Sequence, residues 1–78
     1  MAEPYRPVAC AFHESLEFAV LRRQCLRLRY WDGTAEIEAV VLPLDVATRD
    51  GAEWLTFRSE DGSSQILRLD TLVGAQAI

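Results

Sequence analysis

The chain has 78 residues, is 50% hydrophobic and carries a formal net charge of −4. That length fits one domain, and the hydrophobic content excludes a disordered chain. The negative charge is the opposite of what a phosphate-binding protein needs, so we expect no direct nucleic-acid binding and instead a basic protein partner.

Residues 1–9 predict an extended arm, because Pro4 and Pro7 are incompatible with a helix. The arm lacks the basic start and apolar run of a secretory signal. No stretch of the sequence approaches the roughly 20 apolar residues that span a bilayer. We therefore expect a cytoplasmic protein without membrane contact, in which Cys10 and Cys25 are reduced and mostly buried.

Residues 11–23 predict the only helix, because apolar residues recur there with a 3.6-residue period. The predicted inner face holds Phe12, Leu16, Ala19 and Val20. The opposite side carries Glu14, Glu17 and Leu21, with His13 at its edge. A helix needs an apolar stripe to be held in place, but it does not need outward acids. Those carboxylates are therefore either solvated or bound by something basic.

From Cys25 to residue 31 the hydrophobic period changes to two, which predicts a half-buried strand. The Asp32-Gly33 pair predicts a two-residue type I′ turn, and residues 34–42 predict the returning strand. Charged side chains are expected to pair across this hairpin. They are Glu36 and Glu38 on one strand and Arg27 and Arg29 on the other.

Residues 39–44 are apolar on both faces, which predicts a strand that is covered on both sides or strongly bent. Pro43 predicts the end of that strand or a sheet edge. Residues 45–53 predict a loop with a second Asp-Gly pair. Residues 54–59 and 65–73 predict two further strands, and residues 60–64 predict the turn between them. Residues 75–78 predict a loose tail.

These elements predict an α+β fold that is mainly β, with an N-terminal helix on a strongly bent antiparallel sheet or small open barrel. We expect a single domain over residues 1–78. The predicted core consists of Phe12, Leu16, Val20, Leu26, Leu28, Ile37, Leu55, Phe57, Leu67 and Leu69.

The sequence indicates neither catalysis nor a cofactor. His13 and Cys10 lie one helical turn apart, but no third group would orient a thiolate–imidazole pair. Exposed carboxylates do no acid–base work, and two cysteines with one histidine are too few for a zinc site. Trp31 and Trp54 can stack on bases, although packing on a neighbouring strand is the commoner role.

Four segments of the chain match the sequence motifs of one protein family, in the same order. Tyr5, Pro7, Cys10, Glu14, Leu16, Glu17 and Ala19 fall in register on its opening motif. Its later motifs are matched by "LRLRYWDG" at 26–33, "EWLTF" at 53–57 and "LRLDTL" at 67–72. Through these residues the chain resembles the Rof family, bacterial proteins that bind the transcription termination factor Rho and inhibit it.

The resemblance implies an Sm-like fold, and a protein that docks on the RNA-binding N-terminal domain of Rho and blocks its primary RNA site. The expected contacts are His13, Glu14, Glu17 and Leu21, with Arg49 and Asp50 from a nearby loop. The sequence departs from the family at Ala11 and Phe12, where the family has acids, so the acidic face is thinner. The loop at 47–52 also looks longer than the resemblance implies.

We expect the free protein to be a monomer and not an enzyme. The alternative is an Sm-like module that binds RNA or assembles into a ring. The acidic net charge favours the Rho inhibitor, because an RNA-binding surface would need basic residues interleaved with aromatic ones.

Overall fold

Helix α1 (Cys10–Arg22) opens the part of the chain, residues 10–78, that the computed structural model describes. Its bounds agree with the predicted helix to within one residue. The helix ends in a Schellman motif, in which the Gln24 amide donates to the Ala19 carbonyl at 2.9 Å and the Arg23 amide to the Val20 carbonyl at 3.2 Å. Arg23 takes the left-handed φ of 53° that this motif requires.

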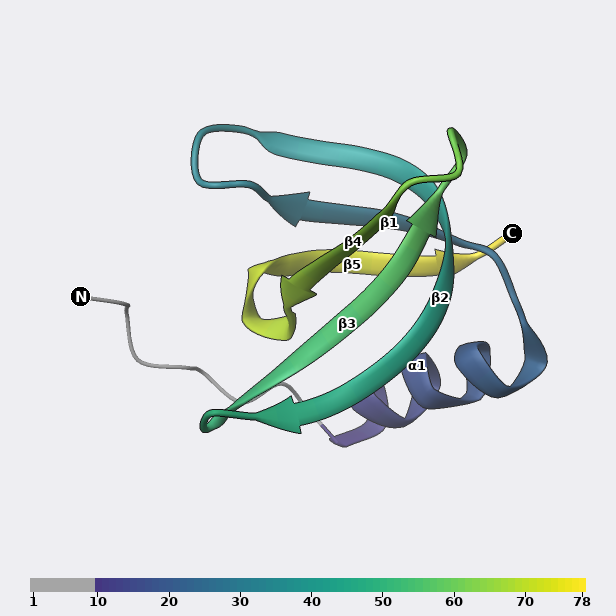
Figure 1. Cartoon of the computed structure of the whole chain (residues 1–78), viewed down its shortest axis with the longest axis vertical. Coiled ribbons are helices and arrows are strands. Elements are labelled where there is room, and N and C mark those ends of the chain that lie inside the picture. The colour runs from purple at the N-terminus through teal and green to yellow at the C-terminus, as the bar shows by residue number, and fades with distance from the viewer. Residues whose placement is uncertain (1–9) are drawn as a thin grey trace.

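Five antiparallel strands form one open sheet in the order β4-β3-β2-β1-β5, which confirms the predicted mainly β, α+β fold. The strands are β1 (Leu26–Trp31), β2 (Glu36–Arg49), β3 (Ala52–Ser59), β4 (Ser64–Arg68) and β5 (Leu72–Ala77). Figure 1 shows β2 and β3 as long, bent strands with α1 lying across one end of the sheet.

The core lies between α1 and one face of the sheet. Six predicted core residues are buried, namely Leu16, Leu26, Leu28, Leu55, Phe57 and Leu69. Phe12 and Leu67 are partly buried against this cluster, whereas Val20 and Ile37 keep more of their surface than predicted. Ala19, Val41 and Ala52 are also buried. The inward phase predicted for β1 is therefore correct, with Leu28 at 0% exposure.

Strand β2 continues through Pro43, where the sequence predicted an end or an edge. Pro43 pairs with Phe57, and the register shifts between Pro43 and Asp45. Such a bulge accommodates a residue that cannot donate to the ladder and bends the strand, as the apolar run predicted. The strand then runs on to Arg49, so the predicted loop at 45–53 is wrong.

Two of the three Asp-Gly turns differ from the predicted ones. Arg49 pairs with Ala52, so Asp50 and Gly51 form a tight two-residue turn with φ values of 54° and 75°. The loop at 47–52 is therefore not long. At the first hairpin Trp31 pairs with Glu36, which leaves a longer turn over residues 32–35 instead of the predicted two-residue turn.

The Asp32 carboxylate holds that first turn. Its Oδ1 accepts hydrogen bonds from the Thr34 and Ala35 amides, each at 2.8 Å. The predicted charge pairs cross the hairpin diagonally, since Arg29 lies 3.2 Å from Glu36 and Arg27 lies 3.8 Å from Glu38.

The predicted strand at 65–73 is two strands, because a 3-10 turn, η1 (Leu69–Thr71), interrupts it. Arg68 Nε donates to Asp70 Oδ1 at 2.8 Å, and Thr71 Oγ1 donates to the Arg68 carbonyl at 2.6 Å. β5 then pairs with β1 as far as Ala77, so the predicted loose tail at 75–78 is wrong. It pairs because the open edge of β1 otherwise leaves backbone groups without partners.

The predicted arm at 1–9 and the side chain of Cys10 lie outside the described residues. Cys25 is a free thiol and is exposed rather than buried. It comes directly before Leu26, which points into the core, so the alternation of the strand turns Cys25 outward.

Candidate functional site

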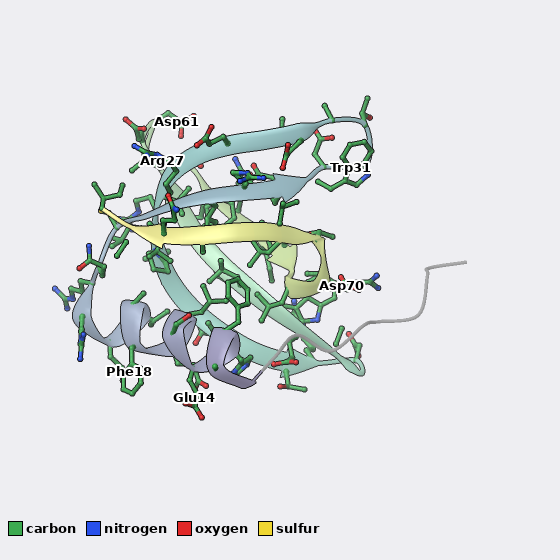
Figure 2. All side chains as sticks on the ribbon, turned by 180° about the vertical axis from the view of Figure 1, so that it is seen from behind. Glu14, Phe18, Arg27, Trp31, Asp61 and Asp70 are labelled. Carbon is green, nitrogen blue, oxygen red and sulfur yellow. The ribbon has the colours of Figure 1, made fainter. Side chains whose placement is uncertain are left out.

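The surface of α1 opposite the core carries three of the six predicted contact residues, namely Glu14, Glu17 and Leu21. We call Glu14, Glu17, Phe18 and Leu21 the outer helix face, since all four are exposed. Leu21 is 78% exposed and Phe18 is 53% exposed. Figure 2 shows Glu14 and Phe18 pointing away from the sheet.

Core packing on the opposite side of α1 holds the outer helix face in a fixed position. Leu16 and Ala19 anchor the opposite side of α1 in the core, and the Schellman motif fixes the end of the helix. A rigid helix presents its exposed side chains at defined positions, so little ordering is needed when a partner binds. Two acids beside two large apolar groups suit a protein partner, because apolar anchors provide buried area and charges provide orientation.

His13 lies at the edge of this face and contacts a carboxylate through each ring nitrogen. Nδ1 is 2.8 Å from Glu17 Oε1, and Nε2 is 2.6 Å from Glu53 Oε2. His13 therefore joins α1 to β3 and positions Glu17, rather than offering a free imidazole to a partner or substrate.

The predicted loop contacts, Arg49 and Asp50, lie at the β2–β3 turn. The contact between Glu53 and His13 brings this hairpin to the first half of α1. Arg49 is already engaged, because its guanidinium carbon lies 5.7 Å from the centre of the Trp54 ring and its carbonyl accepts the Trp54 indole N–H at 2.9 Å.

Sequence reasoning missed Phe18 and Glu53. Phe18 lies four residues after Glu14 and three before Leu21, so helical spacing alone places it on the same face. The guanidinium carbon of Arg22 lies over the Phe18 ring, 5.6 Å from the ring centre. Glu53 gave no comparable signal, because its contact with His13 depends on the hairpin folding back against α1.

Other candidate features have different surroundings. Trp54 packs on its own hairpin as predicted, but Trp31 is 51% exposed and lies at the far end of β1 (Figure 2). Within residues 10–78, no cluster of three or more potential ligands is arranged to hold a metal ion. No helix in this part of the chain is long and apolar enough to cross a bilayer.

The fold is similar to part of a larger protein of known structure. Proteasome accessory factor B/C (PafBC) of Arthrobacter aurescens superposes with a TM-score of 0.78 over 92% of this chain, at 20% sequence identity. The chain spans 12% of the length of that protein. No family model and no curated protein matches the sequence. At this identity the similarity supports the architecture of helix and bent sheet and nothing further.

Proposed function

We propose that the protein binds the RNA-binding N-terminal domain of transcription termination factor Rho through the outer helix face. By covering the primary RNA site of that domain it would reduce Rho-dependent termination in the cytoplasm. The observation that carries the proposal is the exposure of Glu14 and Glu17 beside Phe18 and Leu21 on a helix anchored by its other side.

The chemistry of the two surfaces supports this partner. A site that holds RNA phosphates is basic, and a carboxylate pair on a rigid helix is complementary to it. The formal net charge of −4 adds long-range attraction. Phe18 and Leu21 supply apolar contact area, which a purely electrostatic association would lack.

His13 supports the same role indirectly. Its contact with Glu17 at 2.8 Å restricts that carboxylate to fewer conformations before a partner arrives. Less conformational entropy is then lost on binding. Glu14 has no such restraint among the described residues, so Glu17 is the better positioned of the two acids.

A competition experiment tests the proposal. The isolated N-terminal domain of Rho is loaded with a short fluorescent RNA, and the protein is titrated in while RNA anisotropy is followed. We expect the protein to displace the RNA, and the same protein to raise read-through at a Rho-dependent terminator in vitro. RNA that stays bound at saturating protein would contradict the proposal.

A ring-forming module is the second candidate, and one observation favours it. The edge strands β4 and β5 expose large apolar residues, with Ile66 at 50% and Val73 at 55%. Open edges of this kind can pair between copies. We expect a monomer by light scattering at micromolar concentration, whereas a closed oligomer would favour this second candidate.

A further inference from the structure

The arginines of this chain show an uneven pattern of contacts. All eight basic residues are arginines, and seven of them lie in the described part of the chain. Five of these contact a carboxylate or an aromatic ring, namely Arg22, Arg27, Arg29, Arg49 and Arg68. The other two, Arg23 and Arg58, have no ion-pair partner among residues 10–78.

Both of these arginines line the same groove. It lies where the end of α1 meets β2 and β3, and has a volume of about 350 Å³. We call it the arginine groove, and its lining consists of Val20, Arg23, Leu42, Pro43, Leu44 and Arg58. Four of these residues are apolar and none is acidic, so the groove combines an aliphatic wall with two arginines that have no ion-pair partner among residues 10–78.

The backbone places the two arginines there independently. Arg23 occupies the left-handed position of the Schellman motif, where glycine is the usual residue, so its side chain starts from the end of the helix. A basic residue near a helix C-terminus is favourable in itself. That preference does not account for Arg58, which pairs with Leu42 across β2 and β3.

No acidic residue among residues 10–78 lines the arginine groove. Glu60 lines a neighbouring groove together with Arg58, yet no ion pair joins them. Asp45 follows Leu44 in sequence and lines an adjoining groove together with Glu17 and Val20. An anion in the arginine groove would therefore meet two guanidinium groups without displacing a carboxylate of the protein.

We propose that the arginine groove binds a small aliphatic carboxylate. Guanidinium groups present parallel N–H donors that match the two oxygens of a carboxylate. The aliphatic part of the ligand would lie on Val20, Leu42 and Leu44. Removing water from these apolar surfaces favours binding. A volume near 350 Å³ is at the low end for ligand pockets, which favours a ligand of a few carbons. This site is independent of the proposed Rho contact.

The test is an NMR titration of the ¹⁵N-labelled protein with 4-methylpentanoate. We expect saturable shifts of amides around Arg23 and in the β2–β3 pairing near Arg58. The uncharged amide of the same acid and inorganic phosphate are titrated in parallel, and both are expected to bind at least about tenfold more weakly, because one lacks the charge and the other the aliphatic group.

Matched variants locate the site. Arg23→Gln and Arg58→Gln are each expected to raise the Kd for 4-methylpentanoate by about tenfold or more, since each removes a charged hydrogen-bond donor. Arg27→Gln removes the same charge from β1, outside the groove, and is expected to leave the Kd unchanged. The amide spectrum of each variant reports whether it is folded. Equal binding of the acid and its amide, equal binding of phosphate, or an unchanged Kd in both groove variants would overturn the proposal.

Discussion

Leu28 tests the inward phase of β1 at the scale of one side chain. It is 0% exposed and belongs to the central cluster, so truncation leaves a cavity. We predict that Leu28→Ala lowers the free energy of unfolding by about 2–5 kcal/mol. The matched control is Leu21→Ala, at a residue 78% exposed, for which the change stays within about 0.5 kcal/mol. Urea unfolding measures both, and similar losses in the two variants would contradict the described core.

Two turn aspartates make stability depend on acid pH. The Ala35 amide, followed by the Thr34 amide, lowers the pKa of Asp32 below its ordinary 3.8. The Ser63 hydroxyl, followed by the Ser63 amide, lowers the pKa of Asp61 in the same way. Because the folded-state pKa values lie below the unfolded ones, this stabilisation is present above pH 3.8 and is lost as the pH falls through the lowered values.

We therefore predict that the double variant Asp32→Asn, Asp61→Asn loses part of the wild-type dependence of unfolding free energy on pH below about pH 5. Asparagine keeps an acceptor oxygen but cannot titrate, so the turns persist while the proton linkage disappears. Urea unfolding at a series of pH values measures the slope for each protein. Parallel curves for the wild type and the variant would show that these aspartates are not linked to acid unfolding.

At the scale of elements, His13 is the contact that joins α1 to the β2–β3 hairpin. Its partners Glu17 and Glu53 are 52% and 21% exposed. Each pair is therefore expected to contribute more to stability than a fully exposed ion pair and less than a buried one. We predict that His13→Ala costs about 1 kcal/mol of stability and speeds amide hydrogen exchange in the first half of α1. Glu14→Ala, on the same helix without such a tie, is the control. Unchanged exchange in His13→Ala would mean that the helix is held by its apolar face alone.

The elements also show how far local sequence patterns reach. The 3.6-residue period of α1 and the alternation of β1 report burial directly, so the bounds of both elements were predicted to within one residue. Their inward residues were also predicted correctly, apart from Val20. The same helical period placed Glu14, Glu17 and Leu21 outside. The prediction that the strand ends or meets a sheet edge at Pro43 was wrong, because a proline is compatible with a strand interior where a bulge is present. The bulge depends on the register with β3.

Turn geometry could not be predicted for a related reason. The β1–β2 and β2–β3 hairpins both contain Asp-Gly, but the separation between the last paired residues decides whether a two-residue turn forms. That distance is set by the sheet register, which gives Arg49 with Ala52 in one case and Trp31 with Glu36 in the other. The contact of Glu53 with His13 likewise arises only after the hairpin packs against α1.

At the scale of the whole molecule, the proposed association with Rho is an encounter between opposite charges. The formal net charge of −4 predicts an association rate that falls as salt is raised, because the Debye length at physiological ionic strength is only about 8 Å. The dissociation rate is expected to change less, since Phe18 and Leu21 contribute apolar contact that salt does not screen. Stopped-flow binding at several salt concentrations measures both rates, and a salt-independent association rate would contradict this.

The central claim is that the outer helix face is the surface that binds Rho, and a pair of matched charge reversals tests it most directly. Glu14→Lys with Glu17→Lys changes the formal net charge from −4 to 0 (−4 + 4), and so does Glu38→Lys with Glu60→Lys on other elements. Circular dichroism establishes that both variants are folded, as expected for exposed side chains. Each is then titrated against the N-terminal domain of Rho by calorimetry at low salt. We predict that the helix variant binds at least about tenfold more weakly than the control variant, because like charges would face each other across the interface. Equal affinities of the two variants would contradict the account, since they would show that the outer helix face contributes only its share of the net charge.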